Sequence, residues 1–258
     1  MIITAPHSYL RLLDEVRRQK DGPSPRGMST REIIGHTSMV DMGSPIVDLP
    51  ERRLSYKFMG AEALWILSGS REIHFHRQIS DKLARYSDDS WSLSGAYGPQ
   101  FLSQYRYVVD CLSNDMDTRQ AVITLWSPNP RPSKDIPCTV AMQFLIRDQW
   151  LHLNVSMRSS DAWMGWPYDV FSFTMMATFI GLHYHRRTKM PIDLGALRIF
   201  AGSQHLYSTN YAEADALLKQ YASAEVIGGP RALSLSRHND PEDLLVELRN
   251  MANNGLVQ

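Results

Sequence analysis

The chain has 258 residues, and its 27 basic and 27 acidic side chains give no formal net charge. That length can bury a sizeable core, and a hydrophobic share of 43% argues against disorder. The charge balance excludes the basic excess of proteins that bind nucleic acid without sequence preference. Its apolar runs are too short for a membrane span, and the N-terminal residues lack a signal-peptide pattern. Two cysteines exclude a disulfide framework, so we expect a cytoplasmic protein. From the charge balance and the short apolar runs we expect neither nucleic-acid nor membrane partners.

The first part of the chain predicts helices and a strand separated by loops. An amphipathic helix is expected from Ser8 until Asp21, because Ser8 can cap it and apolar residues recur every three to four positions. Residues 32–40 predict a strand, and the nearly continuous apolar run 58–67 predicts a buried helix. Proline and glycine predict three loops, at residues 22–27, 94–99 and 127–137.

The second part of the chain contributes most of the strands. A buried strand is expected at residues 121–126, and two strand-like runs within 139–159 flank Asp148-Gln149 and predict a hairpin. Further elements are a long apolar helix, a strand and two helices, at residues 167–185, 194–201, 211–221 and from Asp240 onward. Since strands cluster in the middle and no linker divides the chain, we predict an α+β fold in a single domain, residues 1–258.

Each of the two cysteines requires its own interpretation. Cys138 directly follows Pro137, at the junction between a loop and a predicted strand. Catalytic cysteines favour such junctions, although a cysteine is more often a small buried apolar residue. Cys111 lies in the helical pattern of residues 107–112 and is interpreted as part of the core.

Glu62 is the single charge inside the apolar run 58–67. A buried carboxyl there would have its pKa raised toward the neutral range, which suits proton transfer. The alternative is a glutamate at a helix edge that faces water.

Three arginines lie near loops or strand ends, and Ser159 follows the last of them: Arg26, Arg119 and Arg158. Guanidinium groups and a hydroxyl are suited to binding a phosphate, although most arginines are solvated surface residues. No metal site is predicted, because the pairs His74/His76 and His183/His185 have no third ligand at a usual interval.

Two segments resemble the thymidylate synthase superfamily. Pro137-Cys138 matches the family's proline-cysteine nucleophile, and residues 157–169 (MRSSDAWMGWPYD) match its Arg-Ser-x-Asp-x-x-x-Gly-x-Pro-x-Asn motif. Cys138 precedes Arg158 by 20 residues, as in the family. The resemblance implies an α+β fold with a mixed, twisted β-sheet covered by helices.

Further matches follow in the family's order, at residues 61–65, 96–98, 117–119 and 205–207. The resemblance implies that Cys138 is the nucleophile, Glu62 an acid/base and Tyr97 a helper in removing the C5 proton. It implies a phosphate site of Arg26, Arg119, Arg158 and Ser159, and sugar contacts from His205 and Tyr207. It also implies a folate pocket lined by Asp161, Met164, Gly165 and Tyr168. A homodimer follows as well, with Arg119 reaching the neighbour's phosphate.

Three positions depart from the family's pattern: Asp169 replaces its asparagine, Thr139 its usual histidine, and Gln120 the second arginine of an Arg-Arg pair. An amide matches the N3–H and O4 of uracil, whereas a carboxyl accepts from the N4 amino group of cytosine and shares a proton with N3. Asp169 therefore argues for a cytosine substrate. Asp169 and Thr139 together resemble the deoxycytidylate hydroxymethylase branch.

The resemblance implies 5-hydroxymethylation of dCMP, or of CMP, with 5,10-methylenetetrahydrofolate as cosubstrate. Cys138 would add to C6, Asp169 would stabilise charge near N3, and water would add to an exocyclic methylene. One alternative is a methyltransferase that reduces this methylene by hydride transfer from tetrahydrofolate. A non-catalytic pyrimidine-nucleotide-binding protein is the alternative from another class, and dUMP methylation is disfavoured by Asp169.

Overall fold

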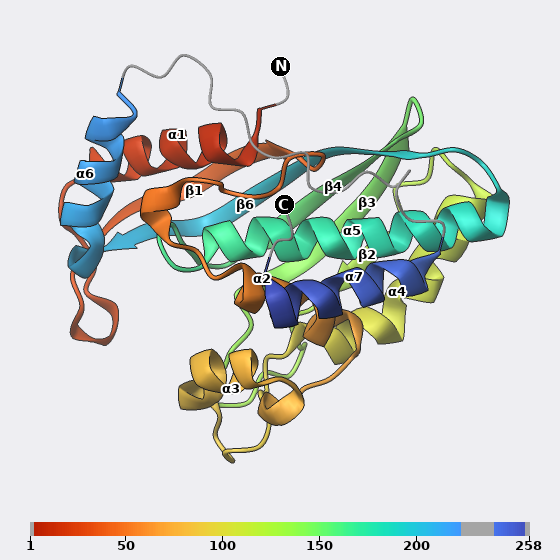
Figure 1. The fold of residues 1–258 in the computed structure, drawn as a ribbon, viewed down its shortest axis with the longest axis horizontal. Helices are drawn as coiled ribbons and strands as arrows, with labels where there is room; N and C mark the ends of the chain where they lie inside the picture. The colour runs from red at the N-terminus through yellow and green to blue at the C-terminus, as the bar shows by residue number, and fades with distance from the viewer. Residues whose placement is uncertain (1–2, 223–239, 256–258) are drawn as a thin grey trace.

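The computed structural model describes residues 3–222 and 240–255, except the side chain of Arg26. Its strands are β1 Thr30–Asp41, β2 Val122–Thr124, β3 Thr139–Arg147, β4 Trp150–Met157, β5 Ser160–Asp161 and β6 Asp193–Tyr207. They form a sheet in the order β1-β6-β4-β3-β2, with β5 beside β6 (Figure 1). β4 and β5 run parallel to β6 and the other pairs are antiparallel, so the predicted mixed sheet is confirmed.

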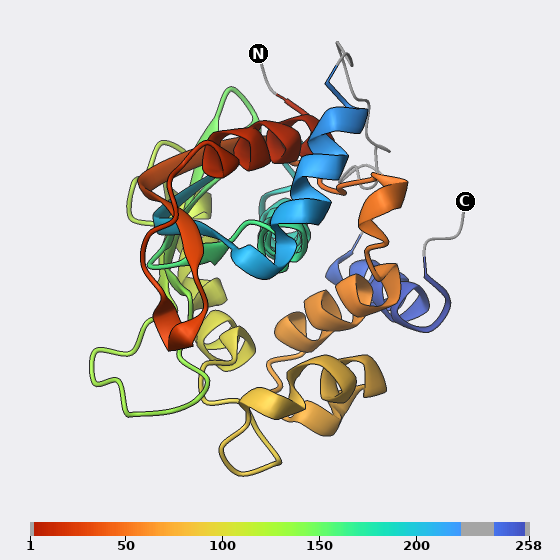
Figure 2. The ribbon, with the colours of Figure 1, turned by 90° about the vertical axis from the view of Figure 1, so that its left-hand side faces the viewer.

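The described residues form seven α-helices: α1 Ala5–Arg17, α2 Tyr56–Leu67, α3 Arg77–Leu83, α4 Tyr97–Asn114, α5 Trp166–Thr188, α6 Tyr211–Gln220 and α7 Pro241–Asn254. Helix α5 is central, and Figure 2 looks nearly along it, with the strands to its left and α2 and α7 to its right. The predicted α+β class is confirmed.

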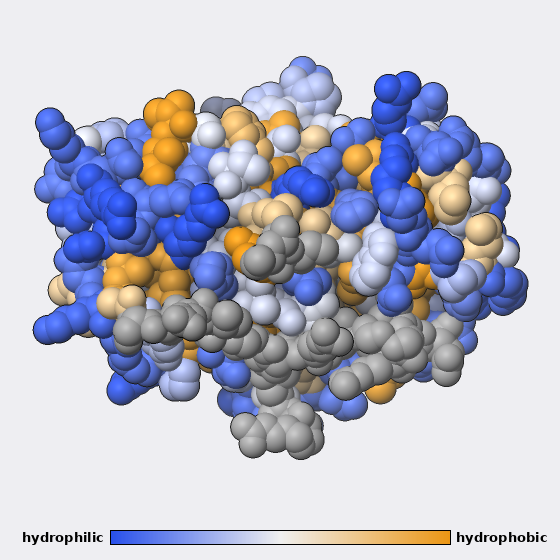
Figure 3. All heavy atoms as spheres, turned by 90° about the horizontal axis from the view of Figure 1, so that it is seen from above, coloured by the Kyte–Doolittle hydropathy of each residue, from blue (hydrophilic) through white to orange (hydrophobic). Residues whose placement is uncertain are grey.

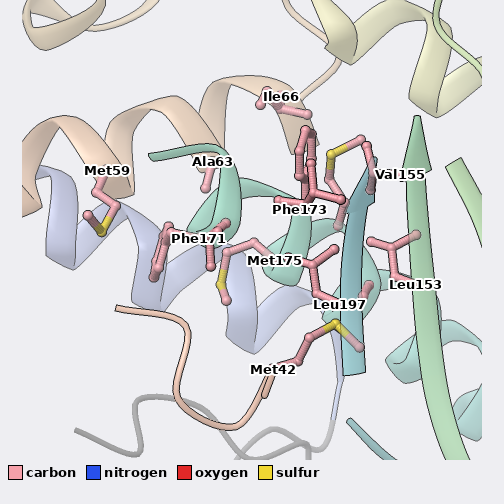
Figure 4. Packing of buried hydrophobic residues seen from close by; sticks show 14 of the residues in the cluster. Met42, Met59, Ala63, Ile66, Leu153, Val155, Phe171, Phe173, Met175 and Leu197 are labelled. Carbon is pink, nitrogen blue, oxygen red and sulfur yellow. The ribbon is translucent and has the colours of Figure 1, made fainter. Parts of the chain in front are cut away.

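Buried apolar side chains of α5 fill the space between the sheet and helix α2. In Figure 4, Phe171, Phe173 and Met175 lie between α2 and the strand residues Leu153 and Leu197. Each of these five side chains has at most 1% of its surface exposed. Thr174 and Thr178, also buried in α5, donate to the carbonyls four residues earlier, so their hydroxyls are satisfied within the helix.

Helix α2 is the buried helix predicted from the apolar run 58–67. Ser55 caps its start, where the serine oxygen accepts from the N–H of Phe58 at 3.2 Å. Helix α7 packs across α2 at Gly60, where an added Cβ would come within 2.8 Å of Met251. This close packing fixes the helix that carries Glu62.

The hairpin predicted at residues 139–159 is present as β3 and β4. Asp148 and Gln149 form its turn, and both have a positive φ, 51° and 66°, as a two-residue turn between antiparallel strands requires. The structure differs from the sequence prediction in the extent of two other strands. Strand β6 extends past residue 201 to Tyr207, and the predicted strand 121–126 is reduced to β2.

Two helix starts also differ from the prediction. Helix α1 begins at Ala5, before Ser8, which is buried inside it. Helix α4 begins at Tyr97, inside the predicted loop 94–99. Pro99 is compatible with this start because the first turn of a helix needs no N–H from that position. Gly98 is required there, since a Cβ would lie 2.8 Å from the carbonyl oxygen of Ile66.

One face of the sheet is exposed. Ile34 of β1 and Phe200 of β6 point to it with 77% and 47% of their surface exposed, while the opposite face is covered by helices. Seen from the side of α1 and α6, the molecule is largely hydrophilic with separate apolar patches (Figure 3). None of the described helices is long and apolar enough to cross a membrane.

Candidate active site

A cavity of about 650 Å³, open mouth included, lies between α2, the start of α4, the loop before β3 and the start of α5. The four residues predicted to be catalytic all line it: Glu62, Tyr97, Cys138 and Asp169. They come from four separate segments of the chain, so only the folded structure brings them together. Apolar and aromatic side chains complete much of the wall, among them Trp65, Ile66, Leu83, Tyr86 and Leu93.

Cys138 is half-buried and immediately precedes β3. Its carbonyl oxygen accepts from the N–H of Arg158 at 2.9 Å. The Arg158 guanidinium holds the same loop, since Nε donates to the Pro137 carbonyl and Nη2 to the Ile136 carbonyl, each at 2.9 Å. Arg158 therefore fixes the backbone on both sides of the candidate nucleophile.

Tyr97 faces the cavity at the start of α4. Its hydroxyl oxygen accepts from the N–H of Thr139 at 3.3 Å and from the Thr139 hydroxyl at 3.0 Å. Burial is the main cause that raises the pKa of Tyr97 above its usual range, and the charges of Asp169 and Cys138 add to it. Tyr97 is therefore a neutral phenol at neutral pH.

Glu62 faces the cavity from α2 and accepts a hydrogen bond from the Ser172 hydroxyl at 3.3 Å. Burial raises the pKa of Glu62 from 4.5 to about 7, and the Ser172 hydrogen bond only partly offsets this rise. The interpretation of Glu62 as a water-facing helix edge does not fit this environment. A carboxyl that titrates near neutrality can both give and take a proton.

Asp169 lies in the first turn of α5, and its carboxyl faces the same cavity. Burial raises its pKa well above the usual range, and the charges of Glu62 and Asp161 raise it further. The raised pKa favours the protonated carboxyl, which can donate one hydrogen bond while accepting another.

Asp135 is a third cavity carboxyl, which the sequence did not single out. Its Oδ2 accepts from the N–H of Gly95 at 2.7 Å, so the loop before Tyr97 is tied to the loop before Cys138. Burial raises the pKa of Asp135, the Gly95 hydrogen bond lowers it, and the charge of Asp88 raises it. A carboxyl three residues before the cysteine, in a proline-rich loop, was the available signal.

The predicted phosphate residues do not line this cavity. Arg119 is exposed near the edge strand β2, and Arg158 is exposed with its guanidinium held by the loop carbonyls. Ser159 follows it and is half-buried. Arg26 lies in the short turn Pro25–Gly27, and its side chain is outside the described part of the structure.

The predicted sugar residues lie at the end of β6. His205 is buried and Tyr207 half-buried, and their rings meet edge to face with centroids 5.0 Å apart. The carbonyl oxygen of His205 accepts from the N–H of Ala162 at 2.8 Å, which attaches β6 to the segment before α5.

The residues predicted to line a folate pocket lie between β5 and α5. Asp161 stabilises this turn, since its Oδ1 accepts from the N–H groups of Trp163 and Met164. Tyr168 accepts from the N–H of Ser55 at 3.0 Å and thereby joins α5 to α2. An added Cβ at Gly165 would lie 3.3 Å from the carbonyl oxygen of Asp161, which is a tight contact. Met164 is 52% exposed.

Comparison with known proteins agrees with this geometry. The family model described as thymidylate synthase matches residues 7–242. The chain belongs to the thymidylate synthase family. It is 27% identical to a protein named "Deoxyuridylate hydroxymethyltransferase" from Bacillus phage SP01, over 79% of this chain and 57% of the phage protein. The chain thus spans little more than half the length of that relative.

Within this family framework, the described residues contain no group of three or more His, Cys, Asp or Glu side chains that could hold a metal ion. His183 instead packs against Tyr105 and Phe179, and His185 Nδ1 lies 2.8 Å from the carbonyl oxygen of Met190 near the end of α5. The titratable side chains that line the cavity are a thiol, three carboxyls and two phenols.

Proposed function

We propose that this protein transfers a one-carbon unit to C5 of a cytosine nucleotide, dCMP or CMP, and produces the 5-hydroxymethyl derivative. The observation that carries the proposal is one cavity lined by a cysteine, a neutral phenol and carboxyls with raised pKa values. A thiolate that adds to C6 of a pyrimidine makes C5 nucleophilic, and the later steps need groups that exchange protons near neutral pH.

The cosubstrate in this proposal is 5,10-methylenetetrahydrofolate, which supplies the methylene carbon when bound. Asp161, Met164, Gly165 and Tyr168 would hold it beside the nucleotide. Cys138 adds to C6, C5 forms a bond to the methylene carbon, and the C5 proton leaves together with tetrahydrofolate. Water then adds across the exocyclic methylene, and the C6–sulfur bond breaks. Glu62 handles the protons of the water step, and Tyr97 assists at C5.

Asp169 supports cytosine as the base. The N3 of cytosine carries no proton, whereas the N3 of uracil does. Burial raises the pKa of the Asp169 carboxyl, and in its protonated form it can supply the proton to cytosine N3 and accept from the N4 amino group. As the thiolate adds to C6, negative charge moves toward N3, and this proton stabilises it.

A second candidate is 5-hydroxymethylation of dUMP. The name of the phage relative favours it, and the raised pKa of Asp169 is compatible with it. A protonated carboxyl can also accept from uracil N3–H and donate to O4. As the thiolate adds to C6 of uracil, negative charge develops at O4, and the donated hydrogen bond would stabilise it there, so product analysis with both nucleotides separates the two candidates.

The phosphate would be held by Arg158 with Ser159, by Arg26, and by Arg119 of a second copy. The support for a homodimer is that Arg119 is exposed and absent from the cavity lining, and that one face of the sheet is uncovered. His205 and Tyr207 would contact the sugar.

Product analysis by mass tests the proposal, with dCMP, CMP and dUMP offered together with methylenetetrahydrofolate. We expect a 5-hydroxymethyl cytosine nucleotide from the native protein and no product from Cys138→Ala. A 5-methyl product with release of dihydrofolate would mean hydride transfer instead of hydration. Preferential turnover of dUMP would support the second candidate, 5-hydroxymethylation of dUMP. Binding of nucleotide without turnover would indicate a non-catalytic nucleotide-binding protein.

A further inference from the structure

Thr139 occupies an unusual position between the candidate nucleophile and Tyr97. It is fully buried, it is the residue after Cys138, and it contacts a tyrosine 42 positions earlier in the chain. A register shift between Thr139 and Ala141 interrupts the pairing of β3 with β4. Such bulges turn side chains next to active sites, and here the bulge accompanies a threonine whose hydroxyl reaches Tyr97.

The hydrogen bonds to Tyr97 determine what its hydroxyl can do. A phenol oxygen has one hydrogen to donate and two lone pairs that accept. The N–H and the hydroxyl of Thr139 both donate to this oxygen, so both lone pairs are used. The phenol's own hydrogen is then free to point into the cavity, which both Tyr97 and Cys138 line.

We propose that Thr139 is a positioning residue that makes Tyr97 a hydrogen-bond donor directed at the sulfur of Cys138. A donated hydrogen bond favours the thiolate over the thiol, and the thiolate is the nucleophilic form. Cys138 directly precedes Thr139 in the chain and lines the same cavity as Tyr97, and the charge of Cys138 contributes to raising the pKa of Tyr97. This role depends on the threonine hydroxyl and does not require the chain's fold to change.

The inference rests on the proposed role of Cys138, but its test needs no nucleotide. Alkylation of Cys138 by iodoacetamide is followed by peptide mass at several pH values, which separates Cys138 from Cys111. Thr139→Val keeps the shape and the backbone N–H but removes the hydroxyl. We expect alkylation at pH 7 to slow by about three- to tenfold, the value of the one neutral hydrogen bond that the variant removes from Tyr97. At high pH, where every thiol is ionised, the rates should converge.

Two further variants separate positioning from general disruption. Thr139→Ser keeps the hydroxyl and should react like the native protein. Tyr97→Phe should be slow, and adding Thr139→Val to it should change nothing more, because the threonine acts through the tyrosine hydroxyl. If Thr139→Val alkylates as fast as native or faster, or if the two substitutions act additively, the inference is wrong. If alkylation behaves as expected but the native protein converts none of the offered nucleotides, only the proposed function is contradicted.

Discussion

At the scale of single residues, the cavity concentrates carboxyls whose surroundings disfavour their charge. Glu62 shows how this affects stability. Because the folded-state pKa is raised to about 7, the native state keeps a proton that the unfolded chain releases above the ordinary value of 4.5. The folded state therefore loses stability as the pH rises through this window.

Glu62→Gln removes this penalty while it keeps the shape of the side chain. We expect the variant to be more stable than the native protein above pH 7, by up to about 3 kcal/mol, and to lose this advantage below the ordinary glutamate pKa. Urea unfolding at about five pH values between about 4 and 8 measures this difference in the free energy of unfolding. Glu242→Gln is the control, because the pKa of this exposed carboxyl is lowered by hydrogen bonds and its substitution brings no such gain. An advantage of Glu62→Gln that is independent of pH would contradict the buried-carboxyl argument.

Asp169→Asn tests the assignment of the pyrimidine edge. An amide held in the orientation that matches the N3–H and O4 of uracil puts its donor against cytosine N4 and its acceptor against N3, so both polar groups of the cytosine edge are mispaired. Two mispaired buried groups cost about 3 kcal/mol, so we expect the ratio of kcat/KM for dCMP over dUMP to fall by about a hundredfold. Asp135→Asn is a matched control, because this cavity carboxyl is held by Gly95 and has no assigned contact with the base. If Asp169→Asn leaves the ratio of kcat/KM for dCMP over dUMP unchanged, Asp169 does not select the base.

The residues that the sequence predicted were those with a chemical signature of their own. A cysteine after a proline, a charge inside an apolar helix and a carboxyl in place of an amide can each be recognised in the chain. Thr139 was noticed as a departure, but its contact with Tyr97 joins residues 42 positions apart and depends on the start of α4. Asp135 was missed because an aspartate in a polar loop usually faces water.

At the scale of elements, the catalytic geometry depends on two loops that touch. An added Cβ at Gly95 would lie 2.9 Å from Pro137 and 3.0 Å from the carbonyl oxygen of Asp135. Gly95→Ala should therefore push the Cys138 loop away from Tyr97, and misplacement by about 1 Å can cost a hundredfold in rate. We expect product formation, or C5 tritium release from dCMP, to fall by about that factor while far-UV circular dichroism is unchanged.

Gly22→Ala is the matched control for this substitution. Its added Cβ would meet nothing closer than 3.9 Å, and its φ lies outside the positive region that favours glycine. The control should keep native activity. Native turnover in Gly95→Ala would show that the contact between the loops does not position the nucleophile.

The elements that the sequence predicted well were those with strong periodicity or a long apolar run, such as α2, α5 and the hairpin of β3 and β4. Residues 94–99 were predicted as a loop because proline and glycine usually break helices, yet Gly98 and Pro99 occupy the first turn of α4. The end of β6 was also missed. Ser203 and Gln204 look polar in sequence, yet they pair with β1, and Gln204 is fully buried with its amide nitrogen donating to Ser160.

At the scale of the whole molecule, the helices cover one face of the sheet and leave the other to solvent. Ile34 and Phe200 are exposed on this face, and burial against a second copy would remove them from water. Arg119, exposed beside the edge strand, could then reach a neighbour's cavity. The order of strands within one chain says nothing about how two chains pair. The homodimer was therefore predicted from the sequence only through the family resemblance.

Subunit complementation tests the shared site. Arg119→Ala and Cys138→Ala each damage every site of a homodimer, so each should be nearly inactive alone. After the two are unfolded and refolded together, half of the dimers are mixed, and each mixed dimer has one site with both residues intact. We therefore expect about a quarter of native activity from a two-fold symmetric dimer. Refolding Arg119→Ala with the double variant Arg119→Ala/Cys138→Ala is the control, because no intact site can form. Recovery no greater than this control, or a monomer in sedimentation, would place Arg119 outside the partner's site.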